Sequence, residues 1–98
     1  MKAVKMNETS VKAWLLAHSA MEADNYGNFK QTTNSGKTYR IKFQKIRIRF
    51  ELQVVFPASE YSPKRTEWML IEGVYFKDIR ITEDNKLVIG KRQLVCVR

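Results

Sequence analysis

The sequence predicts an α+β fold, in which one N-terminal helix packs on a curved, mostly antiparallel sheet of five or six strands or on a partly open barrel. Residues 8–24 have apolar side chains at helical spacing. Residues 37–56 alternate apolar and polar side chains, as a strand with one buried face does. The later segments are short, β-rich and separated by turn residues. We expect residues 1–98 to form a single domain, because 98 residues leave no room for a second core.

The helix is expected over residues 8–24. Thr9 or Ser10 can cap its N-terminus, and Gly27 lies where a glycine would end it. Its short apolar stripe consists of Val11, Trp14, Leu15 and His18. This stripe is long enough to cover one face of a sheet.

A hairpin is expected next. Asn34-Ser35-Gly36 forms a three-residue loop with glycine at the position that needs a left-handed backbone. The loop joins a polar strand, residues 28–33, to the basic segment that follows. The polar strand has little to bury, so we expect it at the edge of the sheet.

Residues 37–56 form the most basic segment of the chain. Six of the thirteen residues from 37 to 49 are Lys or Arg, and none is acidic. The alternation predicts that one face of this segment is cationic and the other belongs to the core. The core-facing set expected in its second half is Ile46, Ile48, Phe50, Leu52 and Val54.

The phase of this alternation changes once, at Gln44-Lys45. A β-bulge there would keep one long bent strand on the same face. Alternatively, Gln44-Lys45 is a two-residue turn that pairs Phe43 with Ile46. Tight hairpin turns prefer Gly, Asn or Asp, so the turn chemistry favours the bulge. Both geometries place Arg40, Lys42, Arg47 and Arg49 on the outer face.

The C-terminal half is expected to be β-rich. Pro57 ends the basic strand, and residues 57–66 are expected to be an exposed loop. Glu83-Asp84-Asn85-Lys86 is a strong turn, and Gly73 and Gly90 mark bulges or tight turns. The predicted strand segments are 68–72, 74–82, 87–89 and 93–97.

The composition argues against most catalytic chemistry. One histidine and one cysteine cannot assemble a zinc set or a nucleophilic triad. We interpret His18 as a structural helix residue and Cys96 as a small buried apolar residue. A metal-dependent nuclease would need clustered carboxylates with a lysine, and the candidates are Glu67, Glu72, Asp78 and Lys77. We interpret these four as solvated strand charges, and therefore predict a protein without enzyme activity, metal or small-molecule cofactor.

The charge distribution predicts the kind of partner. The formal net charge is +8, and residues 37–98 have fourteen Lys or Arg against seven acids. An excess of this kind favours a polyanionic or acidic partner. We expect a cytoplasmic protein without membrane contact. The chain has a lone cysteine, residues 1–20 lack the apolar core of a signal peptide, and no apolar run is long enough to span a membrane.

The leading hypothesis is a small nucleic-acid-binding module that contacts the phosphate backbone of DNA or RNA with low sequence selectivity. Side chains on one face of a strand repeat about every 6.6 Å, which is close to the spacing of phosphates. The predicted contact residues are Arg40, Lys42, Lys45, Arg47, Arg49, Lys64 and Arg65. Candidate aromatic residues for base stacking are Tyr26, Phe29, Tyr61 and Trp68.

The alternative hypothesis comes from another class of protein. A small basic domain of this size, of the kind used by phages and mobile elements, can bind and modulate or inhibit a larger nucleic-acid-processing complex. It would use the same basic face on an acidic surface of that complex, or add its edge strand to a partner sheet.

Overall fold

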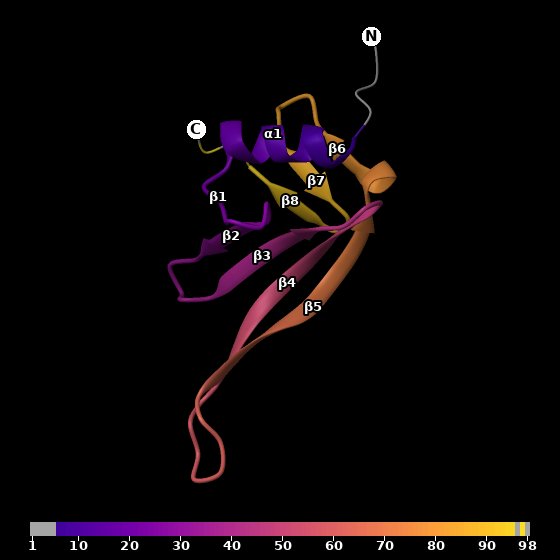
Figure 1. Cartoon of the computed structure of the whole chain (residues 1–98). Coiled ribbons are helices and arrows are strands. Elements are labelled where there is room, and N and C mark those ends of the chain that lie inside the picture. Colours follow the sequence, from indigo (N-terminus) through magenta and orange to yellow (C-terminus); the bar gives the residue numbers. More distant parts are fainter. Residues whose placement is uncertain (1–5, 96, 98) are drawn as a thin grey trace.

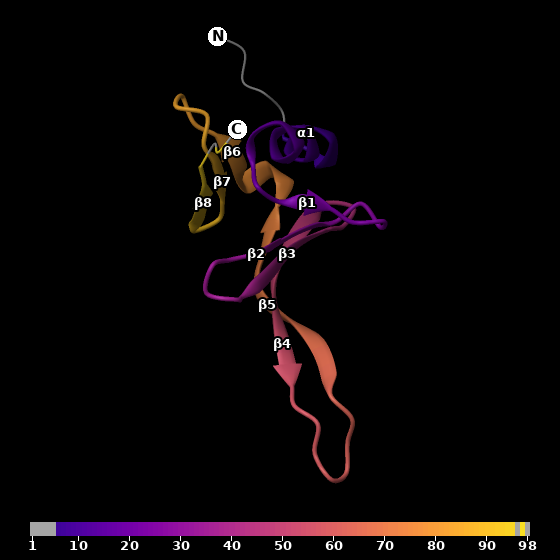
Figure 2. The same cartoon turned by 90° about the vertical axis from the view of Figure 1, so that its left-hand side faces the viewer.

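A computed structural model describes residues 6–95 and 97. The fold is α+β, as the sequence predicts, but its strands form two sheets. The first is a five-stranded antiparallel sheet in the order β1-β2-β3-β4-β5, and the second is a three-stranded sheet, β6-β7-β8. Helix α1 and the second sheet gather at one end of the molecule, while β4 and β5 extend away from them (Figures 1 and 2). The molecule is elongated, with extents of 61 × 27 × 25 Å.

Helix α1 (Glu8–His18) begins where the sequence predicts and ends earlier. The predicted cap, Thr9 or Ser10, is wrong: the cap is Asn7, whose side chain accepts from the Ser10 backbone N–H while the Ser10 hydroxyl accepts from the Asn7 backbone N–H. The predicted extension to residue 24 is wrong because Ser19 turns the chain. Its hydroxyl donates to the Leu15 carbonyl and accepts from the Met21 backbone N–H. The chain then enters β1 (Glu22–Ala23).

The predicted stripe of the helix faces the core. Val11, Trp14 and Leu15 are buried, and the indole N–H of Trp14 donates to the side chain of Asn85 at 3.1 Å. This bond ties the helix to the turn between β6 and β7.

Strands β2 (Phe29–Thr32) and β3 (Thr38–Phe43) form the predicted hairpin. Gly36 has a φ of 86°, so glycine relieves strain at that position. The polar strand is not the edge of the sheet, because β1 pairs outside it. It also has more to bury than expected, since Phe29 is fully inside the core.

The bulge expected at Gln44-Lys45 is wrong, and so is the register of the alternative turn. Phe43 pairs with Ile48, and the Gln44 backbone N–H donates to the Arg47 carbonyl at 2.9 Å. The turn residues are therefore Lys45 and Ile46, and the side chain of Ile46 is 62% exposed instead of facing the core. The Ile46 carbonyl accepts the backbone N–H of Phe76 at 3.2 Å, a contact from 30 residues further along the chain that no local turn rule anticipates.

Strands β4 (Arg47–Phe56) and β5 (Arg65–Tyr75) form the longest hairpin. Their register shifts between Phe50 and Glu51, so that Ile71 is the extra residue of a bulge. β5 begins within the loop predicted over residues 57–66. It also continues through Gly73, so the bulge or tight turn predicted at that glycine is wrong, and the bulge lies at Ile71 instead. Beyond Leu52 the hairpin continues past the end of β3 and becomes a two-stranded projection.

The core lies between the inner face of the five-stranded sheet, α1 and the second sheet. Ile48 and Phe50 are buried as predicted, while Leu52 and Val54 are only half-buried because the projection begins there. The remaining buried apolar residues of this cluster are Val11, Trp14, Leu15, Met21, Phe29, Ile41, Val74, Phe76, Ile79, Leu87 and Ile89.

The second sheet closes the core. It consists of β6 (Ile79–Ile81), β7 (Leu87–Ile89) and β8 (Arg92–Leu94), and a 3-10 turn, η1 (Phe76–Asp78), leads into it from β5. The predicted turn lies between β6 and β7. There the Thr82 hydroxyl and Lys86 hold the pKa of the Asp84 carboxyl below its ordinary value. Cys96 lies outside the described residues.

Two substitutions test the corrected register. Phe50 stacks on Tyr39 with ring centroids 5.5 Å apart and lies under the Arg92 guanidinium, so Phe50→Ala should lower the free energy of unfolding by about 3 kcal/mol. Ile46→Ala should lower it by less than about 0.5 kcal/mol, because this side chain is mostly exposed. Urea denaturation followed by circular dichroism measures both. Equal losses for the two variants would contradict the register.

Candidate nucleic-acid interface

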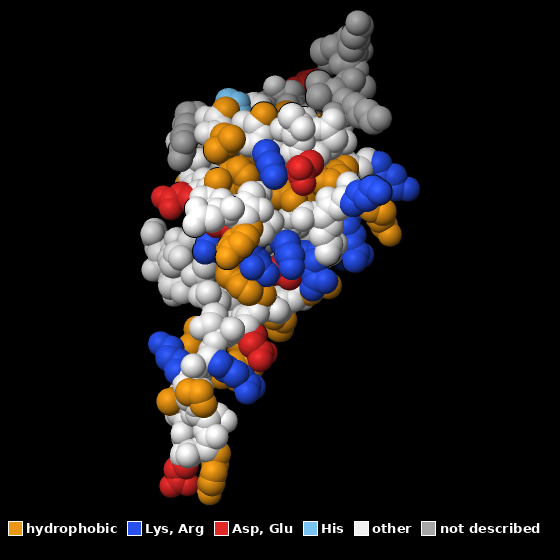
Figure 3. All heavy atoms as spheres, viewed as in Figure 1, with side chains coloured by type: hydrophobic (Ala, Val, Ile, Leu, Met, Phe, Trp, Pro, Cys, Tyr) orange, Lys and Arg blue, Asp and Glu red, His pale blue; other side chains and the backbone are white. Residues whose placement is uncertain are grey.

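The outer face of the five-stranded sheet, which points away from α1 and the second sheet, holds the basic residues of β3 and β4. Across the β3–β4 pair, Arg40 lies opposite Glu51 and Lys42 lies opposite Arg49. Figure 3 shows Lys and Arg side chains gathered over this part of the sheet. The sequence therefore predicts correctly which face is basic, although the β3–β4 turn lies at Lys45-Ile46, one residue beyond Gln44-Lys45.

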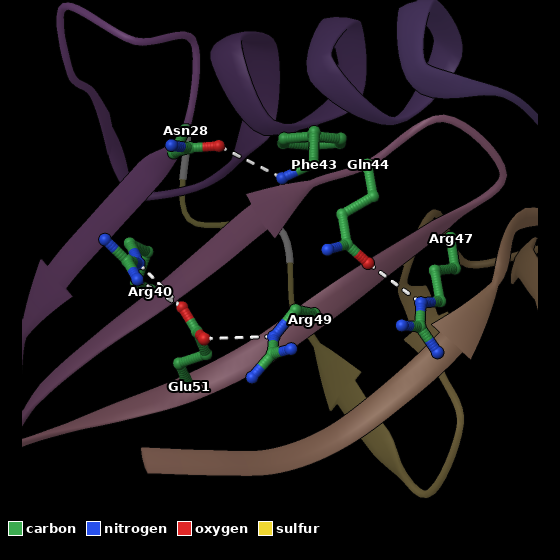
Figure 4. Close-up of polar contacts among 7 residues, drawn as sticks. All are labelled: Asn28, Arg40, Phe43, Gln44, Arg47, Arg49 and Glu51. Atoms are coloured by element: carbon green, nitrogen blue, oxygen red, sulfur yellow. Dashed lines mark hydrogen bonds and ion pairs between the residues drawn. The ribbon is translucent and has the colours of Figure 1, made fainter. Parts of the chain in front are cut away.

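A buried carboxylate organises the centre of this face. Glu51 is only 3% exposed, and one of its oxygens accepts from Arg40 Nε at 2.8 Å while the other accepts from Arg49 Nε at 3.1 Å. Figure 4 shows the carboxylate between the two guanidinium groups. The Arg40 and Arg49 side chains are 17% and 31% exposed. Both arginines lie on the predicted face, but part of their hydrogen-bonding capacity is used within the protein.

Arg40 has a further contact within the protein. Its guanidinium lies over the ring of Trp68, 4.1 Å from the centroid. A guanidinium over an indole face is a favourable cation–π arrangement. One face of Trp68, a predicted stacking residue, is therefore occupied by Arg40, and the three strands β3, β4 and β5 are joined across the outer face.

Unpaired cations lie at the other end of β3 and β4. Lys42 and Arg47 are exposed on the outer face, and Lys45 is exposed in the turn between the strands. Arg47 donates to the Gln44 side chain at 2.8 Å, a neutral acceptor that leaves its charge available (Figure 4). None of these three cations forms an ion pair with an acid in the described part of the chain.

The structure adds two residues that the sequence analysis missed. Tyr75 lies opposite Arg47 in the β4–β5 pair and is 46% exposed, and the Lys77 ammonium lies 5.9 Å from its ring centroid. We call Lys42, Lys45, Arg47, Tyr75 and Lys77 the turn-end cluster. The alternation of residues 73–75 was the only sign in the sequence of the side on which Tyr75 lies. Without the β4–β5 register, it could not show that Tyr75 lies opposite Arg47.

The other predicted contact residues lie elsewhere. Lys64 and Arg65 lie at the far end of the β4–β5 hairpin, about 30 Å along β4 from Arg47 at a strand rise of about 3.3 Å per residue (Figure 1). Arg65 pairs there with Glu67 at 3.4 Å and lies over the Phe56 ring. The structure does not bring these two cations together with the turn-end cluster.

The remaining candidate stacking residues differ in exposure. Tyr26 and Tyr61 are about nine-tenths exposed, in the β1–β2 turn and in the loop between β4 and β5. Phe29 is buried and cannot stack on a base in this fold. Tyr75 is therefore the exposed aromatic residue that accompanies the free cations.

The carboxylates that suggested a metal-dependent nuclease are dispersed. Glu67 pairs with Arg65, and Glu72, further along β5, has its carboxylate against the backbone of Gly90. Across residues 6–95 and 97, no group of three or more His, Cys, Asp or Glu side chains is placed to hold a metal ion. His18 contacts Trp14 with ring centroids 5.6 Å apart, in keeping with its interpretation as a structural residue.

Comparison with known proteins gives no relative: no family model, curated sequence or solved structure matches the chain. Among the described residues, no helix has the length and apolar character needed to cross a membrane. The chemistry of the surface is therefore the basis for a functional proposal.

The buried carboxylate can be tested by its contribution to stability. Glu51→Gln keeps the side-chain volume but removes the charge between Arg40 and Arg49, so the free energy of unfolding should fall by about 2 to 3 kcal/mol. Glu8→Gln is the control, because the side chains of Glu8 and of Lys12, with which it forms an ion pair, are 52% and 29% exposed. Its cost should stay below about 1 kcal/mol. Similar unfolding midpoints for both variants in urea would mean that Glu51 does not organise this face.

Proposed function

We propose that the protein is a small, non-enzymatic nucleic-acid-binding module that contacts the phosphate backbone of DNA or RNA through the turn-end cluster, with low sequence selectivity. The observation that supports this most is that the four Lys or Arg side chains of the turn-end cluster have no ion pair to a described acid, while the ammonium of one of them, Lys77, lies 5.9 Å from the centroid of the exposed Tyr75 ring. Like charges in neighbouring positions repel one another in the free protein. A polyanion removes that repulsion on binding.

The composition of the cluster fits a nucleic acid better than it fits a single small anion. Lys42, Lys45, Arg47 and Lys77 come from β3, from the β3–β4 turn, from β4 and from η1, so they are spread over a surface instead of converging on one point. Lysine and arginine at such positions bind phosphates along a backbone. An exposed aromatic ring among cations also offers a platform for an unstacked base.

The cations around Glu51 extend this surface. Lys30 is exposed and lies opposite Arg40 in the β2–β3 pair, on the same face of the sheet. Arg40 and Arg49 keep part of their guanidinium groups exposed after binding Glu51. We infer that this part of the face adds to the electrostatic attraction, while the turn-end cluster makes the direct contacts. Contacts of this kind position a nucleic acid without reading its sequence.

The salt dependence of binding tests the proposal. If the four cations of the cluster each neutralise a phosphate, log K should fall with log salt at a slope of roughly −3 to −4, by counterion release. Lys42→Gln/Arg47→Gln should reduce the size of that slope by roughly 1.4 to 1.8, with little change in sequence preference. Fluorescence anisotropy with single-stranded and double-stranded oligonucleotides of several sequences measures both quantities.

The control removes the same charge from other places. Lys37→Gln/Lys91→Gln changes one exposed lysine beside the β2–β3 turn and one in the β7–β8 turn, and it should leave the slope nearly unchanged. Equal slopes for the two double variants would contradict the role of the cluster. If Lys42→Gln/Arg47→Gln leaves nucleic-acid binding intact and abolishes binding to a larger protein complex, the basic face serves the alternative function, a modulator of such a complex.

A further inference from the structure

The part of the β4–β5 hairpin that projects from the body is the most exposed feature that the proposed function does not use. After the last β3–β4 pair, Tyr39 with Leu52, the hairpin continues for four more pairs, from Gln53–Trp68 to Phe56–Arg65, and ends in the loop of residues 57–64. Figures 1 and 2 both show this segment pointing away from the body. We call residues 53–68 the arm. A two-stranded ribbon is marginally stable by itself in water.

The arm differs in chemistry from the basic face. It contains two acids, Glu60 and Glu67, and two cations, Lys64 and Arg65, so it is neutral in a chain with a net charge of +8. Its surface has the exposed apolar side chains Val55, Phe56 and Tyr61, and Met69 and Leu70 are exposed on β5 directly beside it. A neutral, apolar ribbon does not attract a polyanion electrostatically. It can approach another copy of this basic chain without charge repulsion.

β5 also presents an open edge. It is the last strand of its sheet, and no other described strand pairs with its outer edge, which runs for the 11 residues of the strand. The N–H and C=O groups along such an edge are available to another strand. The bulge at Ile71 interrupts this edge near the body, so the regular part lies in the arm.

We propose that two copies of the chain associate through their arms, with the β5 strands paired antiparallel about a two-fold axis at Thr66. In this register Arg65 of each copy lies opposite Glu67 of the partner subunit, and Thr66 lies opposite its own equivalent. Opposite charges and threonine pairs in directly opposed positions stabilise antiparallel strands. The segment is therefore complementary to itself, as a two-fold symmetric interface requires.

This pairing keeps the faces of the two ribbons aligned and the positive charges of the two copies apart. Arg65 and Glu67 are two residues apart and lie on the same face of β5, so the register preserves the faces of both ribbons. A two-fold axis between antiparallel strands of one sheet is perpendicular to that sheet, so the outer faces of the two copies lie on the same side. Their turn-end clusters lie at the ends of β4 opposite to the arm tips, so the positive charges stay separated.

A charge-exchange experiment tests the proposal on the full chain, freed of nucleic acid. Sedimentation velocity over increasing protein concentration should show a species of about twice the 11.5 kDa of one chain. Arg65→Glu and Glu67→Arg each place like charges opposite one another at both symmetric positions. Each variant alone should raise the dimer dissociation constant by about tenfold or more.

The mixture of the two variants is the decisive sample. Arg65→Glu has two glutamates at these positions and Glu67→Arg has two arginines, so an equimolar mixture should form a heterodimer at concentrations where each variant alone is monomeric. Lys91→Glu, which reverses a charge in the β7–β8 turn away from the arm, should dimerise like the native chain. A native chain that stays monomeric at all concentrations would overturn the proposal and leave the edge to a different protein. A dimer that neither charge reversal weakens, or variants that do not associate on mixing, would overturn it as well.

Discussion

The buried ion-pair group of Glu51 with Arg40 and Arg49 determines which cations of the outer face are bonded within the protein. A carboxylate that is only 3% exposed needs its charge compensated, and the two arginines supply that compensation from adjacent strand positions. Arg40 also stacks on Trp68, so the group joins β3, β4 and β5. It lies beside the bulge at Ile71, where the five-stranded sheet narrows into the two-stranded arm.

This arrangement divides the positive charge of the basic strands between two roles. Arg40 and Arg49 stabilise the fold around Glu51, whereas Lys42, Lys45 and Arg47 have no acidic partner among the described residues and are exposed. The β4–β5 register then adds Tyr75 and Lys77 to the exposed group. The arm at the other end of β4 is neutral and apolar. The two ends of one hairpin therefore differ in chemistry, and for this reason we propose a polyanion as the partner of the turn-end cluster and a second copy of the chain as the partner of the arm.

Local sequence patterns predicted the parts of the fold that local chemistry decides. The start of α1, its buried stripe, the left-handed Gly36 and the turn before β7 were all visible from spacing and turn residues. The turn at Lys45 and Ile46 was not, because the Ile46 carbonyl accepts the backbone N–H of Phe76, which lies in η1, far along the chain. The basic face was predicted from the sequence. Which of its cations bind Glu51 could not be predicted, because the burial of Glu51 depends on which residues lie opposite it. Tyr75 and Lys77 were missed for the same reason.

The division of the cations can be observed directly by nuclear magnetic resonance, through the side-chain Nε–H signals of the arginines during titration with a single-stranded oligonucleotide. If the turn-end cluster binds nucleic acid as we propose, the Arg47 signal should move during the titration, because this guanidinium is bonded to the neutral Gln44 in the free protein. The Arg40 signal should stay in place, because its Nε–H is already bonded to Glu51. Movement of the Arg40 signal while that of Arg47 stays fixed would contradict the separation of structural cations from binding cations.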